Sequence, residues 1–356
     1  NIGFEGRKYM YFSELIKYEV IKMLEITAQL KESLKDCNQC LREKYNYRSE
    51  VNDLKLRKLI EQELGAFKVL DKLEQERLKE WTNVGAIIGV DGSVNTLGKI
   101  YPHYLSVLQG LAKNTIKSED EIIQHEVFSP LIESDRAKIF KKYHKEEIES
   151  APEAAGKLRT SLLAELEVKV AYASIKEWQP QLIMMDGSLS RYKFQAEDSW
   201  EGLVDLALQE DVLLLGVIEE IGTHKISENL KDDLPLKMEN MYDRELLFGL
   251  LEQREIMKID NITLTHGFKK AFFRSARDPG VIGLDILKEQ QSELNFAAQV
   301  VDALTPQDGR GVPLWLDIVD NEVRISNKML NAMVDNYIDA DLKQKLFHSK
   351  RNDRIY

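Results

Sequence analysis

The sequence predicts an α/β fold in which a central mixed sheet is flanked by helices. Three observations support this prediction. Short apolar runs rich in β-branched residues alternate along the chain with longer helical stretches. Two of the runs, "IIGVDGS" from Ile87 and "LIMMDGS" from Leu182, end in the same Asp-Gly-Ser turn signal. The first 80 residues carry no Pro and show helical periodicity. Strands interleaved with helices are typical of an α/β sheet.

The composition is that of a globular protein with a sizeable core. The 356 residues are 43% hydrophobic and 31% charged, which is enough for one large or two ordinary domains. The formal net charge of -11 disfavours a nonspecific polyanion binder, because such proteins need a basic excess. No apolar run approaches the ~20 residues that cross a bilayer. The first residues lack the layout of a secretory signal. We therefore expect a cytoplasmic protein that does not enter the membrane.

The N-terminal region, residues 1–82, is predicted to form a helical arm. From about residue 12 to 80 the chain is rich in Leu, Glu, Lys and Arg. One apolar seam with steps of four and three ends near Leu41, and a second continues through Leu56, Ile60 and Leu64. We expect a helical hairpin that turns within residues 45–53. Its charged face is either solvated or a contact surface for a partner or a dimer.

Two cysteines, Cys37 and Cys40, form a CxxC pattern inside this arm. A zinc site would need two further ligands at metal spacing nearby, and the sequence shows none. Cys37 instead continues the apolar seam. We therefore predict a cysteine that packs within helices.

The remaining chain, residues 83–356, is predicted to be one domain built on the sheet. A charged segment near 117–156 reads as a helical insertion or connector. The expected strands cover residues 84–93, 103–112, 181–188 and 211–221, with others inside 261–276 and 281–287. The expected helices cover residues 154–178, 196–209, 240–256, 294–304 and 321–338.

The two Asp-Gly-Ser endings predict an active site. Open α/β sheets place ligands at the carboxyl ends of their strands, and Gly lets the backbone turn away there. If the two strands are neighbours, Asp91 and Asp186 lie close together. Adjacent carboxylates repel unless a cation separates them, so a divalent metal is the expected occupant. The alternative is that both are ordinary Asp-Gly turns.

A third carboxylate is expected from the helix that precedes Asp186. Glu167 lies on the apolar stripe that includes Leu163 and Val170, and a Glu on a buried stripe requires a partner. Glu165 lies among more polar positions and is expected to be solvated. We prefer Glu167 as a metal ligand and retain Glu165 as its rival.

A fourth candidate, Asp320, lies in "GRGVPLWLDIVDNEVRIS". The apolar run from Val312 to Leu316 precedes it, and "NEV" follows it. Asp320 fits either the N-cap of a helix or a metal ligand.

Taken together, the "VDGS", the helical Glu, the "MMDGSLSR" and the "GVPLWLDIVD" resemble the NurA family over Val84 to Ser326. The resemblance implies a ribonuclease H-like core and a DNA nuclease with exo- and endonuclease activity. It implies that Asp91, Glu167 (or Glu165), Asp186 and Asp320 hold one or two Mn²⁺ or Mg²⁺ ions. It also implies a homodimer that processes and resects DNA ends with a HerA-type hexameric ATPase translocase.

The chain departs from the family pattern at one position. Some family members have a Tyr before the Pro of the last motif, where this sequence has Val312. Lys225 is a weak match to a Lys that often follows the second Asp. His266 and His348 could shuttle protons, although a lone His is more often a surface or packing residue.

Basic residues interleave with aromatic ones in "FKKAFFRSAR". Lys269, Lys270, Arg274 and Arg277 alternate there with three Phe residues, a mixture suited to phosphate and base contacts in DNA. The alternative is a strand with one solvated basic face.

Two other functions fit parts of the sequence. An actin-like ATPase or sugar kinase shares the core but needs a residue between Asp and Gly, which "VDGS" lacks. A catalytically inactive scaffold for an ATPase would use the carboxylates only as turns and caps. Stabilisation by Mn²⁺ distinguishes the nuclease from the scaffold.

Overall fold

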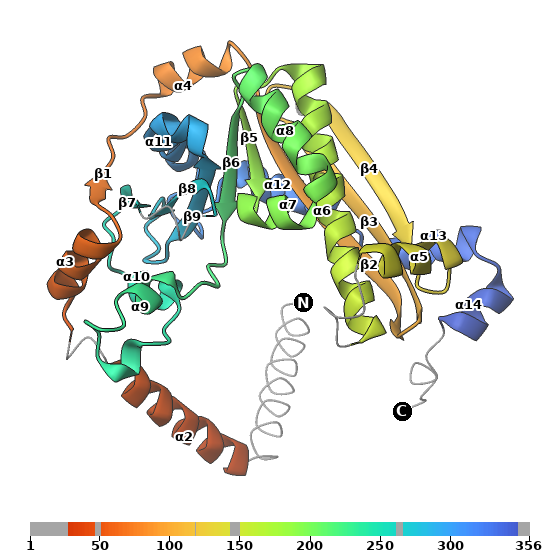
Figure 1. Ribbon diagram of the computed structural model, residues 1–356, viewed down its shortest axis with the longest axis horizontal. Helices are drawn as coiled ribbons and strands as arrows, with labels where there is room; N and C mark the ends of the chain where they lie inside the picture. The colour runs from red at the N-terminus through yellow and green to blue at the C-terminus, as the bar shows by residue number, and fades with distance from the viewer. Residues whose placement is uncertain (1–27, 47–50, 118, 143–149, 261–265, 348–356) are drawn as a thin grey trace, which may run out of the picture.

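The computed structural model describes residues 28–46, 51–117, 119–142, 150–260 and 266–347. Nine strands in these residues form one sheet in the order β1-β7-β8-β9-β6-β5-β2-β3-β4 (Figure 1). The strands are β1 (Phe67–Val69), β2 (Ile87–Ile100), β3 (His103–Asn114), β4 (Glu121–Phe128), β5 (Leu182–Asp186), β6 (Leu213–Ile218), β7 (Glu255–Ile259), β8 (Phe268–Phe273) and β9 (Ile282–Leu287).

The centre of the sheet has the ribonuclease H-like arrangement. β2, β3 and β4 form an antiparallel meander, and β2 also pairs in parallel with β5. β5 in turn pairs in parallel with β6. The parallel part is buried on both faces, in agreement with its continuous apolar sequence. The predicted fold class, a mixed sheet flanked by helices, is confirmed.

Helices cover both faces of this sheet. α6, α7 and α8 pack on one face through residues such as Val168, Leu189 and Leu203. α11 and α12 pack on the other through Val301 and Leu316. The helices are α2 (Ala28–Tyr45), α3 (Asp53–Glu63), α4 (Gln75–Thr82), α5 (Glu133–Lys142), α6 (Ala151–Trp178), α7 (Leu189–Gln195), α8 (Glu197–Gln209), α9 (Lys225–Asn229), α10 (Asp243–Leu247), α11 (Leu294–Leu304), α12 (Leu314–Val323), α13 (Asn327–Tyr337) and α14 (Ala340–Leu346), with the 3-10 helices η2 (Leu236–Met238) and η4 (Lys288–Glu293). In the residues described, no helix has the length and apolar character of a membrane span.

The sequence suggested that the charged segment 117–156 is a helical insertion or connector, but the segment is not wholly helical. It contains β4, which pairs with β3 from Ser106↔Phe128 to Lys113↔Glu121. β4 is the last strand of the sheet in the described residues, and its charged side chains suit an edge strand, where they discourage pairing with other chains. The charge of this segment therefore reflects an edge position. Among the residues of this segment that the structure describes, α5 and the start of α6 are helical.

The N-terminal region is also not a continuous helical hairpin. The second seam forms α3 as predicted, with Leu56 and Ile60 buried against the α9–α10 region. However, the chain then forms β1, which pairs with β7. Arg57 of α3 forms an ion pair with Glu255, which is 4% exposed. The expected boundary at residue 82 therefore falls within packed structure rather than between separate bodies.

The first seam of the arm has no packing partner among the described residues. Leu30, Leu34 and Leu41 of α2 are each at least half exposed. Cys37 and Cys40 are exposed as well, so the prediction of a packed cysteine is wrong. The seam pattern shows how a helix can pack, but it cannot show that a partner is present. The seam positions before Ala28 lie outside the described residues.

Two of the predicted helices differ from those observed. Within the expected helix at 240–256 only the short α10 forms, and the last two residues begin β7, which pairs between β1 and β8. The expected helix at 321–338 begins earlier, at Leu314 after Pro313, and breaks before Asn327. Asp320 therefore lies inside α12 and is not an N-cap. Pro at the first helical turn is common because its missing N–H needs no partner there.

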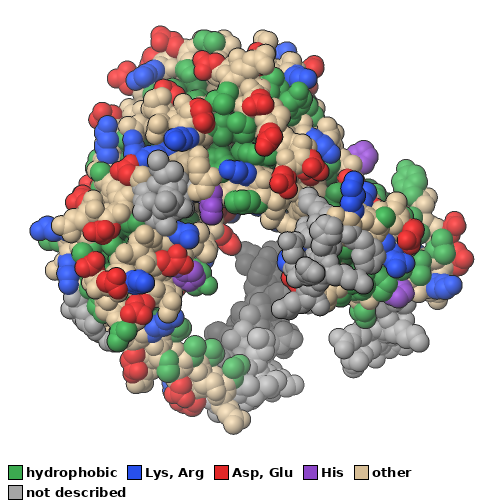
Figure 2. All heavy atoms as spheres, viewed as in Figure 1, with side chains coloured by type: hydrophobic (Ala, Val, Ile, Leu, Met, Phe, Trp, Pro, Cys, Tyr) green, Lys and Arg blue, Asp and Glu red, His purple; other side chains and the backbone are tan. Residues whose placement is uncertain are grey.

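The molecule has a concave side. Figure 1 shows α3, α9 and α10 on one side of it, and the lower half of α6 with the β2–β3 hairpin on the other. α7 lies between them, where β5 and β6 end. Figure 2 shows that the surface is hollowed below α7. The carboxyl ends of the parallel strands therefore face this hollow.

Candidate active site

Asp91 lies where the parallel part of the sheet ends. Pairing of β2 with β5 stops at Val90↔Met185. β2 itself continues, because Asp91 and Gly92 pair with Leu111 and Gly110 of β3. The prediction that this Asp-Gly-Ser turns away from the sheet is therefore wrong. The antiparallel partner β3 keeps the strand extended, so there is no loop here that could wrap a phosphate.

Asp186 ends β5 and is followed by the expected turn. Gly187 adopts a left-handed φ of +116°, which favours glycine. The Ser188 side chain then accepts a hydrogen bond from the backbone of Ser190 and caps α7. Tyr192, fully buried in α7, donates its hydroxyl to the Asp186 carbonyl at 2.8 Å. α7 thus fixes the backbone that carries the second carboxylate.

Glu167 of α6 packs directly against the Asp91 strand. It is 1% exposed, and a Cβ at Gly92 would lie 2.8 Å from its carboxyl oxygen. Gly92 therefore leaves the space that this side chain occupies. Glu165 instead accepts a hydrogen bond from Ser199 of α8 and is half-buried rather than solvated. The structure brings Glu167, and not Glu165, to the two aspartates.

These three carboxylates share a buried and repulsive environment. Burial, followed by repulsion from Asp186 and Glu167, raises the pKa of Asp91 to about 8. Burial raises the pKa of Glu167 to about 7 although Arg191 opposes the shift. The pKa of Asp186 is also raised, chiefly by burial. Asp320 adds repulsion at Asp91 and Asp186 and so lies near both. Like charges held together in this way favour a cation between them.

Arg191 is a site residue that the sequence reasoning missed. Its Nη2 lies 2.6 Å from Glu167 Oε2 and 3.4 Å from the Asp186 carbonyl oxygen. Its guanidinium also lies 4.4 Å from the centre of the Tyr192 ring. Arg191 therefore supplies a positive charge to the cluster. It is the last residue of the quoted "MMDGSLSR", but only the turn of α7 directs it back towards α6.

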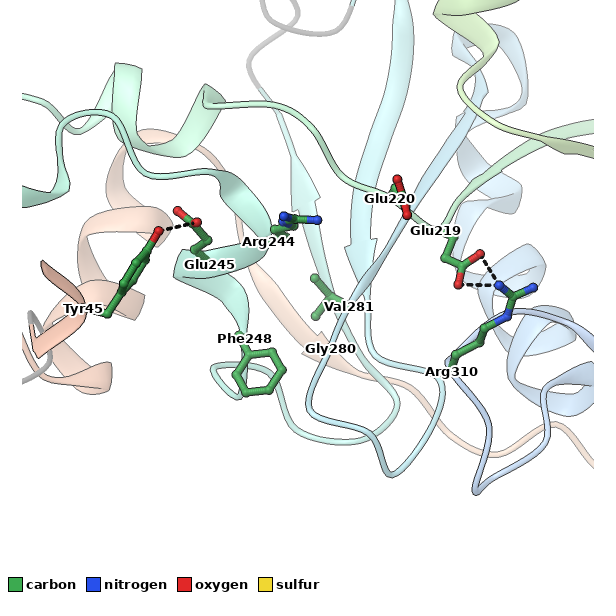
Figure 3. Close-up of a pocket in the computed structure, with 9 residues that line it drawn as sticks. All are labelled: Tyr45, Glu219, Glu220, Arg244, Glu245, Phe248, Gly280, Val281 and Arg310. Carbon is green, nitrogen blue, oxygen red and sulfur yellow. Dashed lines mark hydrogen bonds and ion pairs between the residues drawn. The ribbon is translucent and has the colours of Figure 1, made fainter. Parts of the chain in front are cut away.

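A third strand-end carboxylate, Glu219, was also missed. It follows β6 and raises the pKa of Asp186. Figure 3 shows Arg310 pairing with both of its oxygens, at 2.7 Å, and Glu219 on the wall of a cavity of about 550 Å³. Arg310 also bonds Asp317 of the helix that carries Asp320. The signal was present in "LLLGVIEE", an apolar run that ends in carboxylates like the other two.

The NurA domain model matches residues 85–325, which are more than half of the chain. The chain belongs to the NurA family. The crystal structure of the NurA nuclease from Sulfolobus solfataricus has 14% identity and a TM-score of 0.52, over 91% of this chain and 98% of that one. Endonuclease V structures also match: that from Bacillus subtilis has 12% identity and a TM-score of 0.37, over 82% and 96%. That from Ciona intestinalis, solved with a 23mer DNA, has 12% identity and a TM-score of 0.34, over 73% and 100%. No curated protein matches the chain.

The carboxylates fit a hard divalent cation in chemistry, although not yet in geometry. As placed, no three His, Cys, Asp or Glu side chains in the described residues form a group that could hold a metal ion. The reason is local: Glu167 is tied to Arg191, and Asp91 Oδ1 accepts from the Gly92 N–H at 2.7 Å. Burial nevertheless raises the pKa of Asp91 and of Glu167, so a cation bound beside these carboxylates would stabilise their charged forms. Mg²⁺ commonly needs only one or two carboxylates, with water and substrate phosphate completing its shell.

The four basic residues expected to contact DNA are all engaged within the protein. Lys269 pairs with Asp260, and Lys270 pairs with the buried Asp285 at 2.8 Å. Arg277, which is 69% exposed, pairs with Asp308. The guanidinium of Arg274 donates to three backbone carbonyls, those of Leu251, Arg277 and Asp278. Arg274 therefore has a structural role, because these bonds hold neighbouring loops together. The expected row of phosphate contacts does not form a single free surface.

The remaining positions flagged in the sequence have defined places. Val312 is buried in the core beneath α11. Lys225 begins α9, and its ammonium group pairs with Glu228 at 3.2 Å. His266 packs edge-on against Phe194, with 5.4 Å between ring centres. His348 lies outside the described residues. None of these three described side chains reaches the carboxylate centre through a contact among the described residues.

Proposed function

We propose that this protein is a DNA nuclease that hydrolyses phosphodiester bonds with Mn²⁺ or Mg²⁺. The observation that supports the proposal most strongly is the burial of Asp91, Glu167 and Asp186 at one edge of the parallel strands, where burial is the first cause that raises the pKa of each of the three carboxyl groups. A cluster of buried carboxyl groups with raised pKa values is costly in a folded protein and is typical of a functional site. The match to the NurA family supports the reaction class.

The residues divide into ligands and supports. Asp91, Asp186 and Glu167, with Asp320, would hold one or two ions. A bound ion would lower the pKa of a water molecule and stabilise the leaving oxygen. Arg191 balances the charge of Glu167 while no cation is bound, and Tyr192 holds the backbone of Asp186.

Family membership supports the biological setting. We propose that the protein acts on DNA ends, by exo- and endonucleolytic cleavage, as a homodimer with a HerA-type hexameric ATPase. The net charge of -11 is compatible with this arrangement, because a translocase can supply much of the grip on DNA. Light scattering tests the dimer, and co-purification with a HerA-type ATPase tests the partner.

Cleavage of end-labelled linear DNA tests the reaction. The wild-type protein is incubated with Mn²⁺, Mg²⁺ or a chelator, alone and with the ATPase. We expect metal-dependent cutting that falls at least 100-fold in Asp186→Asn, since a ligand is lost without a change in size. Glu165→Gln on the same helix as Glu167 is the matched control and should cut normally. Normal cutting by Asp186→Asn would rule out this site.

A second candidate function is an inactive scaffold for an ATPase. The ion pair between Arg191 and Glu167 favours it, because it satisfies one carboxylate without metal. The scaffold predicts no metal-dependent cleavage in the presence of the ATPase and no stabilisation by Mn²⁺. The nuclease predicts both, because a ligand that binds only the folded state raises its stability.

A further inference from the structure

A second cavity, of about 350 Å³, adjoins the carboxylate centre. Its wall is formed by the first turn of α7, the chain that follows β6, and the strands β8 and β9. Ser190 of α7 lines this cavity, while the next residue, Arg191, contacts Glu167. The first turn of α7 therefore separates the cavity from the carboxylates. A helix with its side chains is only about 10 Å wide.

The walls of this cavity are apolar, and its base is polar. Ile218 and Phe272 line it, and Phe272 is 6% exposed. At the base, Asp285 is 1% exposed, and its Oδ2 accepts from Lys270 Nζ at 2.8 Å and from Ser188 Oγ at 2.5 Å. An apolar pocket with a few convergent polar groups is typical of a small-ligand site.

Two polar atoms at this cavity are left without partners. Asp285 Oδ1 and Ser190 Oγ are both buried, and neither has a hydrogen-bond partner within the described residues. Buried polar atoms normally have partners, and an exception needs an explanation. Asp285 Oδ1 can accept from an N–H group of a ligand, and the Ser190 hydroxyl can donate or accept. The free groups thus match the hydrogen-bonding edge of a nucleobase, and the apolar walls match its faces.

We propose that this cavity binds a single unstacked base of the DNA strand whose backbone lies at the carboxylates. The proposal rests on the proposed nuclease function and narrows its substrate. A base can enter the cavity only if it is unpaired, so the preferred substrate is single-stranded DNA or a frayed end. The neighbouring phosphodiester then reaches Asp91 and Asp186 within one or two nucleotides.

Gly222 offers a way to block the cavity. It lines the cavity, its φ is not left-handed, and a Cβ there meets no atom within 4 Å. Gly222→Trp therefore adds bulk at the wall without backbone strain. Gly202 of α8 is also open, so Gly202→Trp is the matched control outside the cavity. If Gly222→Trp does not fold, as judged by circular dichroism, Gly222→Leu replaces it.

The experiment measures kcat/KM for a series of oligonucleotides in which one abasic nucleotide is moved along the strand. For wild type and Gly202→Trp, we expect kcat/KM to fall about 10-fold when the abasic nucleotide is the one that enters the cavity, given the usual contribution of base stacking. Gly222→Trp should have a kcat/KM about 10-fold lower than wild type on the intact strand. Its kcat/KM should not depend on the position of the abasic nucleotide. Equal rates along the wild-type series would overturn the proposal, as would unchanged abasic dependence in the Gly222 variant.

Bis(4-nitrophenyl) phosphate, a phosphodiester without a base, separates this proposal from the nuclease itself. Metal-dependent hydrolysis of this compound by wild type, with no abasic dependence on DNA, rejects the base pocket and retains the nuclease. If neither the compound nor DNA is hydrolysed, the proposed nuclease function is rejected, and the base pocket that rests on it is rejected as well.

Discussion

At the residue scale, the contact between Arg191 and Glu167 determines how the metal-free protein tolerates its buried carboxylates. Glu167 is 1% exposed and Arg191 is 30% exposed, so their charges are poorly screened by solvent. Removing one member of a buried pair leaves the other charge without compensation, which is costly. Under the proposed function, the same contact would compete with a metal for Glu167. We therefore expect Arg191 to act as a positioning residue that would link stability to metal binding.

We predict that Arg191→Gln destabilises the metal-free protein by roughly 3 kcal/mol because Glu167 loses its partner. Urea unfolding in chelator measures the change. Arg136→Gln, which removes the exposed ion pair with Glu133, is the control and should change stability by less than about 1 kcal/mol. Equal effects of the two substitutions would show that the Glu167 pair is not buried as described.

Asp91 gives a prediction on pH. Its pKa is raised to about 8 in the folded protein, from 3.8. Between about pH 4 and 8 the unfolded chain has released a proton that the folded protein keeps, so folding stability falls as pH rises. Asp91→Asn should reduce this fall by up to ~1.4 kcal/mol per pH unit. Unfolding free energies at several pH values in chelator measure it, with the exposed Asp198→Asn as control. Parallel curves for wild type and Asp91→Asn would contradict the prediction.

At the element scale, the site depends on how closely β2 approaches α6. Gly92 is the position that permits this approach, because any Cβ there would press on the Glu167 carboxyl group. The same glycine lies in a paired strand, so its role is space rather than a turn. This contact between two elements cannot be read from either element alone.

We predict that Gly92→Ala lowers metal-dependent cleavage at least 10-fold while changing the melting temperature by only a few degrees. The added Cβ meets the far end of a flexible side chain, which can move at little cost but then leaves its place. Cleavage rates and thermal melts of the variant measure the two effects. Gly202→Ala, at an exposed position of α8, controls for the loss of a glycine. Full activity of Gly92→Ala would show that the position of Glu167 is not critical.

The sequence predicted elements whose pattern is local. β5, β6, α6, α8 and α11 follow from apolar runs and periodicity. β4 and β7 were missed because a strand beside a charged or helix-like stretch is defined by its partners in the sheet. At the site, the two Asp and the buried Glu167 could be predicted from position on strand or stripe. Arg191 could not, because its role depends on a tertiary contact with Glu167. Glu219 could have been predicted from its position at the end of an apolar strand, although its pairing with Arg310 could not.

At the scale of the whole molecule, the chain from Val51 to Thr82 is part of the sheet structure. α3 packs with α9 and α10, β1 extends the sheet, and Leu70 and Leu73 join the core beneath α11. α2 differs, because from Gln29 to Lys44 its residues are exposed. The described region thus has one part that depends on the sheet and one that does not.

Two N-terminal deletions test this division. A protein that lacks residues 1–73 loses β1 and the buried side chains of Leu56, Ile60, Leu64, Leu70 and Leu73. Their burial is worth on the order of 10 kcal/mol, and we predict that this protein does not fold cooperatively. A protein that lacks only residues 1–44 keeps them and should melt cooperatively. Thermal melts followed by circular dichroism compare the two. Similar cooperative melts for both deletions would show that α3 and β1 are dispensable.

The central claim is that Asp91, Glu167 and Asp186 together bind a divalent metal, and calorimetric titration with Mn²⁺ tests it most directly. We predict saturable binding of one or two Mn²⁺ ions to the wild-type protein at neutral pH. Glu165→Gln should retain this affinity, and Asp186→Asn should bind Mn²⁺ with an affinity at least 100-fold lower. Wild-type protein that binds no Mn²⁺, or Asp186→Asn that binds it as tightly as wild type, would contradict the account.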